Sequence, residues 1–357
     1  MLGAKMPDLV TVDGTSGGGQ ILRNAVALSA VTGRPVRVEN IRASRPKPGL
    51  RPQHLLGLTA AADLCGASLT GAAIGSREIE FHPQQIRPRR DWRLDIGTAG
   101  SITLVLQCLL PALCRAGDRS ALTLTGGTDV PFSPPFEYFS QVFLAALAEM
   151  GPQVTARCAV RGFYPKGGGQ LEVEVKPDGA LRPITWTERG AVTLIRGISY
   201  SLGLPDHIAK RMRVSAANTL YTAGYRKLDL RLDVAERGRS EGCGIMLWAE
   251  CETGRRLGAS ALGERGKRAE RVGEEAAQAL LADLASDAAV DSHLADQLIV
   301  WLALADGPSE FTAPRITDHL RSAIAVAEAI SDARFRVSDG TPVVVRRLHP
   351  SDLRSGI

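Results

Sequence analysis

The most informative segment of the sequence reads Arg161-Gly162-Phe163-Tyr164-Pro165-Lys166-Gly167-Gly168-Gly169-Gln170-Leu171. Three successive glycines permit positive φ angles and bring bare backbone N–H groups close to a ligand, which suits a phosphate. Arg161 and Lys166 are then expected to add charge-assisted contacts to the same anion. The alternative is a tight turn between two strands, and on this segment alone the turn is favoured. Both interpretations predict strands that flank the glycines.

The composition is that of an ordinary globular protein. The 357 residues are enough for two domains, 44% of them are hydrophobic, and the formal net charge is +5. This mildly basic balance is compatible with a polyanionic partner. The sequence has no signal-peptide core, no apolar run long enough to cross a membrane, and no CxxC spacing among its six cysteines. We therefore expect a cytoplasmic protein with buried free thiols and no membrane contact.

A pattern of strand, small-residue turn and helix recurs along the chain. The helices expected from apolar periodicity lie at about 20–32 and 54–64, at 102–113 and 136–150, and at 298–304 and 319–330. Strands are expected at 10–12, 36–38 and 121–125, and a loop at 312–314. The constant spacing of the first two copies indicates a duplicated unit, and the last two helices indicate a third copy.

The third copy begins about 100 residues later than the repeat predicts. The intervening segment has its own strands at 193–200, 229–235 and 245–251 and amphipathic helices at 209–222 and 268–285. We therefore predict an α/β (α+β) fold in which three βαβαββ units form a large domain that carries a small inserted α/β domain. The predicted division is 1–183 for repeats one and two, 184–285 for the insert, and 286–357 for repeat three.

Two segments near the N-terminus are candidate phosphate sites. Gly18, Gly19 and Gln20 open a helix whose free N–H groups and dipole favour an anion, and Arg23 follows one turn later. A simple strand-to-helix turn with a surface arginine remains the alternative. The loop 42–54 carries four cations and three prolines without any acid, so a stiff backbone presents its positive charge. A role in binding a phosphate or a sugar-phosphate backbone is favoured for this loop.

His319 is the candidate nucleophile. It follows Thr317-Asp318, which is typical of a helix N-cap, and it ends the loop of the third copy that corresponds to the basic loop of the first. A helix N-terminus disfavours imidazolium, and a neutral imidazole can attack a phosphoryl centre. A lone histidine at a helix start is more often a capping or surface residue, so its location is what favours catalysis.

Three polar residues in apolar helical surroundings are further candidates. Asp296 and Gln297 are expected to open the first helix of the third copy, where helix capping by Asp291 or Ser292 is expected as well. Gln107 lies in an apolar helix and needs a hydrogen-bond partner if buried, for which a ligand is one possibility. The sequence has no Walker A motif, so any nucleotide site is of another type.

With these residues in place, the chain resembles the RNA 3'-terminal phosphate cyclases over essentially its full length. The matching motifs are the runs 17–23, 41–54, Thr98-Ala99-Gly100-Ser101, Gly126-Gly127-Thr128, 161–169 and 294–298. The resemblance implies repeated βαβαββ units with a small α/β insert. It also implies that His319 takes AMP from ATP and passes it to an RNA 3'-phosphate, after which the vicinal 2'-OH closes a 2',3'-cyclic phosphate and releases AMP.

The resemblance also implies ligand contacts for particular residues. ATP, with Mg²⁺ or Mn²⁺ as its divalent cation, would lie against Gln107, Pro134, His293, Leu294, Ala295, Asp296 and Gln297, with Pro134 and His293 flanking the adenine. The phosphates of ATP or of the RNA end would lie against Gly18, Gly19, Gln20, Arg23, Arg42, Arg45 and Gln53. Family members often have tyrosine at the position of His293, so the stacking there is expected to differ.

One departure from the family pattern concerns the metal. The glycine run of the family is usually preceded by a glutamate that helps to hold the metal, whereas Thr15-Ser16 lead directly into Gly17 here. Asp13 is the one acid close enough in sequence to substitute. The metal ligand is therefore left unassigned.

Two other functions compete with cyclisation. A non-catalytic, cyclase-like RNA-binding or ribosome-assembly protein would have no need of His319, Gln107 or Asp296-Gln297, but the missing glutamate fits it. An enolpyruvyl-transferase-like enzyme also uses repeated βαβ units and basic clusters, but needs no histidine nucleophile. The expected partners are RNA with a 3'-phosphate and ATP, and a homodimer is possible although no heptad pattern supports one.

Overall fold

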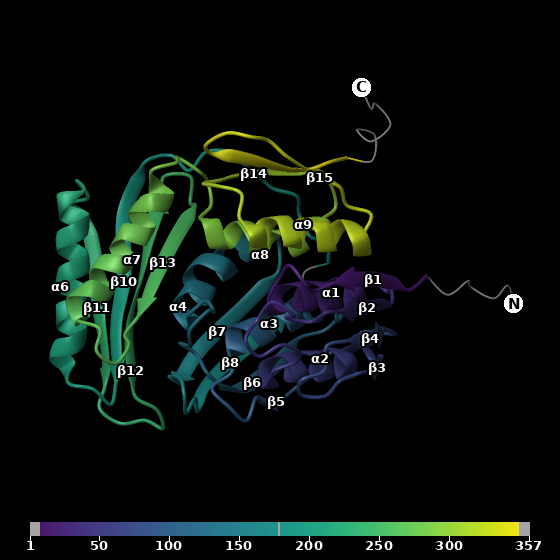
Figure 1. Cartoon of the computed structure of the whole chain (residues 1–357). Coiled ribbons are helices and arrows are strands. Elements are labelled where there is room, and N and C mark those ends of the chain that lie inside the picture. Colours follow the sequence, from purple (N-terminus) through teal and green to yellow (C-terminus); the bar gives the residue numbers. More distant parts are fainter. Residues whose placement is uncertain (1–7, 178, 350–357) are drawn as a thin grey trace, which may run out of the picture.

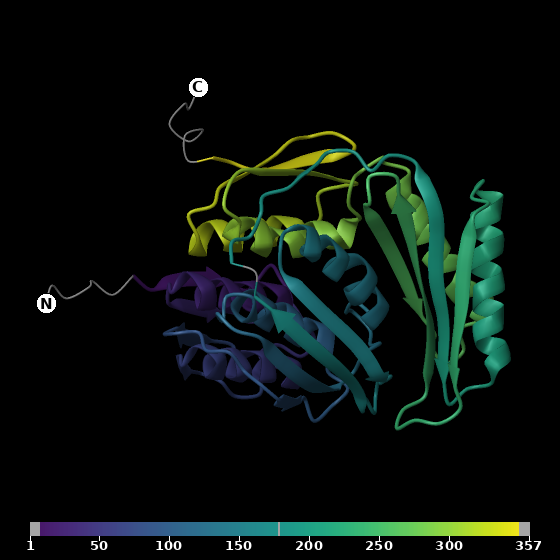
Figure 2. The same cartoon turned by 180° about the vertical axis from the view of Figure 1, so that it is seen from behind.

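The structure is a computed structural model that describes residues 8–177 and 179–349. It is a mixed α/β protein whose strands form four small sheets. In Figure 1, helices α8 and α9 lie between the sheet that contains β14 and helix α1, and the sheet with β10 to β13 stands to one side. Figure 2 shows β7 and β8 from the opposite side. Within the described residues, no helix has both the length and the apolar character needed to cross a membrane.

The first sheet has the order β1-β2-β4-β3, with β1 parallel to β2 and the other pairs antiparallel. Its elements are β1 (Val10–Asp13), α1 (Gly19–Thr32), β2 (Val36–Glu39), α2 (Pro52–Cys65), β3 (Ser68–Thr70) and β4 (Ile79–His82). Both helices end at glycines in the left-handed region, Gly33 and Gly66, as the sequence predicts. Pro52 begins α2, where its missing N–H costs no hydrogen bond.

The second sheet has the order β5-β6-β8-β7 and the same pattern of parallel and antiparallel pairs. Its elements are β5 (Trp92–Asp95), α3 (Ile102–Leu113), β6 (Ser120–Gly126), α4 (Phe136–Tyr138), the π-helical turn η1 (Phe139–Phe143), α5 (Leu144–Glu149), β7 (Gln153–Val160) and β8 (Gly169–Lys176). The helix expected at 136–150 is therefore present as α4, η1 and α5 in succession.

The third sheet, of order β9-β14-β16-β15, repeats this pairing pattern once more. Its elements are β9 (Thr185–Trp186), α8 (Ser292–Leu304), β14 (Ser309–Ala313), α9 (Asp318–Ile330), β15 (Phe335–Val337) and β16 (Val343–Arg347). The loop expected at 312–314 is wrong for Thr312 and Ala313, which pair with β16. Helix α8 starts six residues before the predicted 298, because the buried carboxylate of Asp291 caps it.

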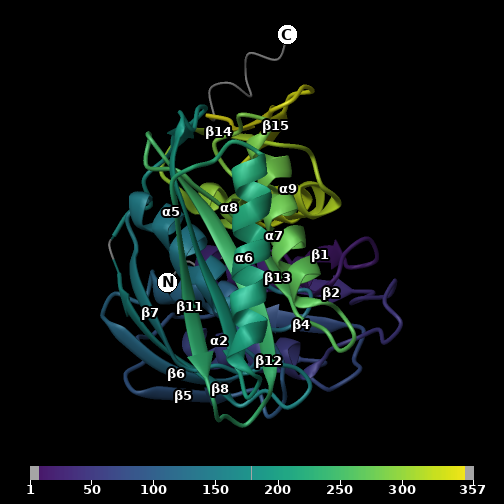
Figure 3. The same cartoon turned by 90° about the vertical axis from the view of Figure 1, so that its left-hand side faces the viewer.

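The fourth sheet has the order β11-β10-β12-β13, and α6 and α7 cover one face of it (Figure 3). Its elements are β10 (Val192–Leu202), α6 (Asp206–Thr222), β11 (Leu228–Ala235), β12 (Gly242–Cys251), β13 (Arg256–Leu262) and α7 (Ala269–Leu284). Strand β13 was not predicted from the sequence. The short strand β9 lies within the segment 184–285 but pairs with β14, so the domain division stays a prediction.

Two apolar clusters hold the chain together. The larger one joins the first three sheets to the helices between them, and α1 packs there against α2, α3 and α9. The smaller one lies between the fourth sheet and helices α6 and α7. Burial of these side chains fixes the N-termini of α1, α8 and α9 relative to one another, which is what positions the candidate site.

Candidate functional site

His319 lies in the first turn of α9, at the N-terminus that the sequence predicts. Thr317 caps this helix, since its hydroxyl oxygen accepts the N–H of Leu320 at 3.0 Å. The imidazole is exposed, and its Nδ1 contacts Oε1 of Gln20 in α1. Partial desolvation lowers the pKa of His319, and the nearby positive groups of Arg23 and Arg45 lower it further. These surroundings therefore favour the neutral imidazole over the imidazolium.

Gln20 fixes which nitrogen of His319 carries the proton. Its amide Nε2 donates to Oδ2 of Asp296 at 2.6 Å and to the backbone oxygen of His319 at 3.3 Å. The amide oxygen of Gln20 therefore faces the imidazole, and Nδ1–H donates to it. This leaves the Nε2 lone pair of His319 free for attack. Gln20 is only 5% exposed, so the arrangement is held in place by packing.

Asp296 and Arg23 lie in the buried part of the same cluster. Burial raises the pKa of Asp296 to about 7, even though electrostatic interactions with His293 and Arg23 oppose the shift. Burial also lowers the pKa of Arg23, and its Nε has no hydrogen-bond partner among the described residues. A buried guanidinium nitrogen without a partner is costly unless a ligand completes it.

The first turn of α1 faces the side chains of Arg45 and His54. Gly18 is the N-cap, and no side chain of the described residues caps the first turn. A Cβ atom on Gly18 would lie 3.2 Å from Nη2 of Arg45, and one on Gly19 would overlap Nε2 of His54. A small anion at this helix N-terminus would therefore be close to Arg45 and His54.

His54 was not predicted to be a site residue from the sequence. Its Nδ1 accepts the N–H of Arg51 at 3.1 Å, so the remaining proton is on Nε2, which points toward Gly19. Burial, together with the positive charge of Arg42, lowers the pKa of His54 to about 3. The signal that could have identified it is its place at the end of the basic loop.

Arg42 and Gln53 make bonds within the protein. The guanidinium of Arg42 donates to the backbone oxygens of Lys47 and Gly49 at 2.8 and 2.9 Å, which folds the basic loop back on itself. Oε1 of Gln53 accepts the N–H of Ser101 at 2.7 Å and so joins the start of α2 to the start of α3. Both side chains therefore shape the loops beside the N-terminus of α1.

The residues expected around an adenine meet at α3 and α8. Nε2 of Gln107 donates to Oε1 of Gln297 at 2.8 Å, and Nε2 of Gln297 donates to the backbone oxygen of His293 at 3.0 Å. The hydroxyl of Thr103 donates to the backbone oxygen of Pro134 at 2.8 Å. Gln107 thus has a protein partner, and Pro134 is tied to the same helix one turn away.

Leu294 and Ala295 face a different direction from their neighbours. Their side chains are buried in the larger apolar cluster, and their N–H groups donate to Asp291. His293 turns the edge of its ring toward Tyr138, with ring centres 6.3 Å apart and planes at 89°. The side chains of His293, Asp296 and Gln297 are therefore the ones that α8 offers to this site.

The glycine-rich segment 161–169 is a turn between β7 and β8, so the turn interpretation is correct. Arg161 donates to Asp129 at 3.2 Å, to both carboxylate oxygens of Glu137, and to Asp233 at 2.8 Å. Its guanidinium also lies 4.0 Å from the ring centre of Tyr200. The expectation that Arg161 binds a phosphate is therefore wrong, because three carboxylates already neutralise it.

Acidic residues are sparse where a metal ion was expected. Within residues 8–177 and 179–349, no group of three or more His, Cys, Asp or Glu side chains could hold a metal ion. Oδ1 of Asp13 accepts hydrogen bonds from Thr15 and Asn40, which lower the pKa of this carboxyl. Asp13 by itself is not a metal site, so the side chains present do not fit a divalent ion held by the protein alone.

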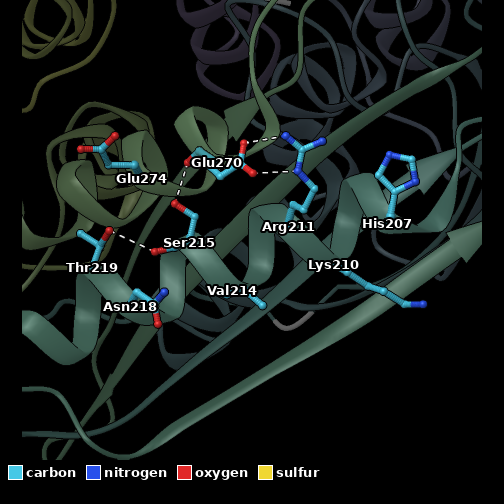
Figure 4. Close-up of a pocket in the computed structure, with 9 residues that line it drawn as sticks. All are labelled: His207, Lys210, Arg211, Val214, Ser215, Asn218, Thr219, Glu270 and Glu274. Atoms are coloured by element: carbon cyan, nitrogen blue, oxygen red, sulfur yellow. Dashed lines mark hydrogen bonds and ion pairs between the residues drawn. The ribbon is translucent and has the colours of Figure 1, made fainter.

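Two cavities lie away from this cluster. One of about 410 Å³ is on the outer side of α6 and α7, where Arg211 forms a two-point ion pair with Glu270 and the hydroxyl of Ser215 donates to the backbone oxygen of Glu270 (Figure 4). The other, of about 300 Å³, lies between the fourth sheet and η1 and is lined by Arg196 and Trp248 among others. Neither contains a residue of the candidate site.

The sequence of this chain matches a known protein family. The family model described as RNA 3'-terminal phosphate cyclase matches residues 14–337. A protein of that name from Caldivirga maquilingensis is 44% identical over 96% of this chain and 98% of its own length. Proteins of the same name from Archaeoglobus fulgidus and Pyrococcus abyssi are 47% and 45% identical, over 88% and 90% of this chain and 93% and 92% of their own lengths.

A solved structure, the enolpyruvyl transferase NikO from Streptomyces tendae, is similar over 96% of this chain and 66% of that one. Its sequence identity is 17% and its TM-score is 0.28, so it carries no argument about function or fold. The family resemblance seen in the sequence is confirmed by the family model and the relatives. The chain belongs to the RNA 3'-terminal phosphate cyclase family.

Proposed function

We propose that this protein is an enzyme that uses ATP to convert an RNA 3'-terminal phosphate into a 2',3'-cyclic phosphate. The observation that carries the proposal is the contact of Gln20 with both His319 and Asp296, in a chain that belongs to the cyclase family. This contact leaves an exposed, neutral imidazole with a free Nε2 lone pair beside an unpartnered buried arginine. Such an arrangement suits nucleophilic attack on a phosphoryl group.

His319 is the nucleophile in the proposed first step. Its Nε2 attacks the α-phosphorus of ATP, forms an N–P bond, and releases pyrophosphate as the Pα–O bond breaks. Gln20 holds the Nδ1 proton during the attack, so the positive charge that develops on the ring is stabilised by the amide oxygen and, beyond it, by Asp296. Arg23 and Arg45, both near the imidazole, would neutralise charge on the phosphates.

The adenosine half of ATP would lie along α3 and α8. Gln107 and Gln297 supply amides there, while Pro134 and His293 supply flat surfaces for the adenine. The phosphates would lie at the open N-terminus of α1, where Gly18 and Gly19 leave backbone N–H groups free of capping side chains in the described structure.

The RNA end completes the proposed reaction in two further steps. An oxygen of the 3'-phosphate attacks the phosphorus of the histidine-bound AMP, the N–P bond breaks, and His319 returns to its neutral form. The vicinal 2'-OH then attacks the 3'-phosphorus and loses its proton to solvent, and the P–O bond to AMP breaks, which releases AMP and leaves the cyclic phosphate. Adenylylation is needed because a phosphomonoester has no good leaving group, and only RNA has the 2'-OH that closes the ring.

We also infer that the chain consists of three repeated units and one inserted domain. The three sheets with the same pairing pattern support three βαβαββ units, and the separate apolar core under α6 and α7 supports an inserted domain near 184–285. A divalent cation, Mg²⁺ or Mn²⁺, would enter with ATP and would neutralise charge on its phosphates. The cytoplasmic location and the possible homodimer stay predictions.

The test is covalent labelling with α-³²P-ATP in the absence of RNA, followed by denaturing electrophoresis. The wild-type protein should retain an acid-labile label, and His319→Ala should retain none. His207→Ala removes a histidine from the first turn of α6, far from the cluster, and should label like the wild type.

A second measurement follows the RNA end. A 3'-phosphorylated oligonucleotide should become resistant to phosphatase when ATP is present, and an oligonucleotide whose last sugar lacks the 2'-OH should not. If neither Mg²⁺ nor Mn²⁺ supports labelling of the wild type, the enzymatic proposal fails. Retained RNA binding would then favour the non-catalytic alternative.

A further inference from the structure

The tip of the glycine-rich turn projects an aromatic side chain into solvent. Tyr164 is 68% exposed, and Pro165 and Lys166 beside it are also exposed. The glycines on either side, Gly162 and Gly167, are buried. The proposed chemistry at His319 uses none of these tip residues, although the turn is the most specific motif of the sequence.

Several contacts hold this tip rigid. The N–H of Gly167 donates to the backbone oxygen of Phe163 at 2.7 Å, and the N–H of Phe163 donates to the hydroxyl of Ser240 at 2.9 Å. Gly167 has a φ of +64°, and a Cβ on it would lie 2.8 Å from Cα of Ala99. A side chain presented by such a fixed turn loses little backbone entropy when it binds a ligand.

Positive charge lies beside the tip. The methylene groups of Arg239 pack against Gly168 so closely that a Cβ there would overlap Cδ of Arg239. Both Lys166 and Arg239 are exposed, and neither forms an ion pair within residues 8–177 and 179–349. An aromatic ring with free cations next to it is the composition of surfaces that bind single-stranded nucleic acid.

A second exposed aromatic residue lies on the adjoining loop. Phe132 is 96% exposed and has a φ of +63°, a conformation that costs energy for a bulky residue. Three residues before it, Asp129 forms a backbone bridge with Phe163, the neighbour of Tyr164. The loops that carry the two rings are therefore joined at their bases.

The surface connects to the candidate site through packed backbone. Gly167 packs on Ala99 in the turn before α3, and the N–H of Ser101 in that turn donates to Gln53 at the start of α2. Gln53 is followed by His54, whose ring contacts the first turn of α1. This series of packed residues therefore links the turn that carries Tyr164 to the phosphate-binding part of the candidate site.

We propose that Tyr164 and Phe132, with Lys166 and Arg239, form a surface on which the unpaired nucleotides before the 3'-phosphate of the RNA stack. This proposal rests on the proposed function, because it supplies the polynucleotide part of that substrate. Bases stack on the rings without regard to sequence, and the two cations contact the phosphates between them.

The test is fluorescence anisotropy with a 5'-labelled, single-stranded 12-nucleotide RNA that ends in a 3'-phosphate, without ATP. Tyr164→Ala and Phe132→Ala should each weaken binding about tenfold, whereas Tyr164→Phe, which keeps the ring, should bind nearly as the wild type does. Lys166→Ala should reduce the slope of log affinity against log salt by about 1. Thermal unfolding midpoints should not fall, because all these side chains are exposed.

Matched controls come from α6 and the loop after it. Tyr221, 41% exposed, and Lys227 are an aromatic and a cation outside the surface, so Tyr221→Ala and Lys227→Ala should bind RNA as the wild type does. Unchanged affinity in Tyr164→Ala and Phe132→Ala would overturn the proposal and assign the surface to another partner. Absence of ATP labelling in the wild type would overturn the proposed function separately, since the binding assay needs no ATP.

Discussion

The two glycine runs of this protein have similar sequences and opposite surroundings. Gly17-Gly18-Gly19 opens α1 without a capping side chain in the described structure, next to Arg45 and one turn from Arg23. Gly167-Gly168-Gly169 closes a turn beside Arg161, whose guanidinium already binds three carboxylates. The two runs therefore differ in whether the neighbouring arginine is already paired with carboxylates, and only the first run is proposed to bind an anion.

The pKa shifts of the two arginines express the same contrast. Burial alone would lower the pKa of Arg161, but the charges of Asp129 and Glu137 outweigh it and raise the pKa. For Arg23, burial dominates and lowers the pKa, because Asp296 compensates only in part. Arg161 is thus stabilised by the fold, whereas Arg23 is held in an environment that a bound anion would improve.

The largest expected effect is on stability. Arg161→Met leaves the buried carboxylates of Asp129 and Glu137 without a cation, so the free energy of unfolding should fall by about 3–5 kcal/mol. Urea denaturation measures this change. Arg157→Met removes an exposed pair with Glu172 and should cost less than about 1 kcal/mol. Equal losses in the two variants would contradict the structural role of Arg161.

Arg23→Met tests the other side of the comparison. The variant removes a buried guanidinium whose Nε has no partner among the described residues, so stability should be kept or slightly raised. The rate of self-labelling with ATP should fall by about 100- to 1000-fold, because a donor to the reacting phosphates is lost. A stable variant with a wild-type labelling rate would show that Arg23 does not contact ATP.

Apolar periodicity and the positions of glycines predicted several helices and their ends. The apolar run 102–113 matches α3 residue for residue, and Gly33 and Gly66 end α1 and α2 in the left-handed conformation that favours glycine. Strand β13 was missed, because only the small residues Gly258 to Ala261 lie between its two leucines, and glycine and alanine have weak strand propensity.

Local sequence patterns could not predict which side chains contact each other in the candidate site. Gln20 meets His319 across 299 positions of sequence, and Arg161 meets Asp233 across 72. The repeats predict that the loop before His319 lies near the basic loop, but they do not determine which side chains touch. Side-chain rotamers and packing in the assembled core decide that choice, and this is why the sequence could not show that Arg161 is paired with carboxylates.

Asp296 should make stability depend on pH. Its pKa in the folded protein is about 7, above its value of about 4 in an unfolded chain, so the protonated carboxyl favours the fold. This contribution is complete below about pH 4 and is lost as pH rises to 7, at about 1.4 kcal/mol per pH unit. Urea denaturation of wild type and Asp296→Asn at pH 5, 6 and 7 measures it. Parallel pH profiles would show that the carboxyl is not held protonated.

The smallest expected effect on stability is that of Gly18→Ser at the N-terminus of α1. Gly18→Ser adds a hydroxyl that can cap α1, and the new Cβ would lie 3.2 Å from Arg45, so stability should change by only a few tenths of a kcal/mol. The hydroxyl competes with a phosphate for the same N–H groups, so the ATP concentration for half-maximal labelling should rise. Gly33→Ser, at the other end of α1, has open space around it but a φ of +76°. It should therefore cost stability without changing the ATP requirement, and the two variants together separate ligand binding at the N-terminus from the helix itself.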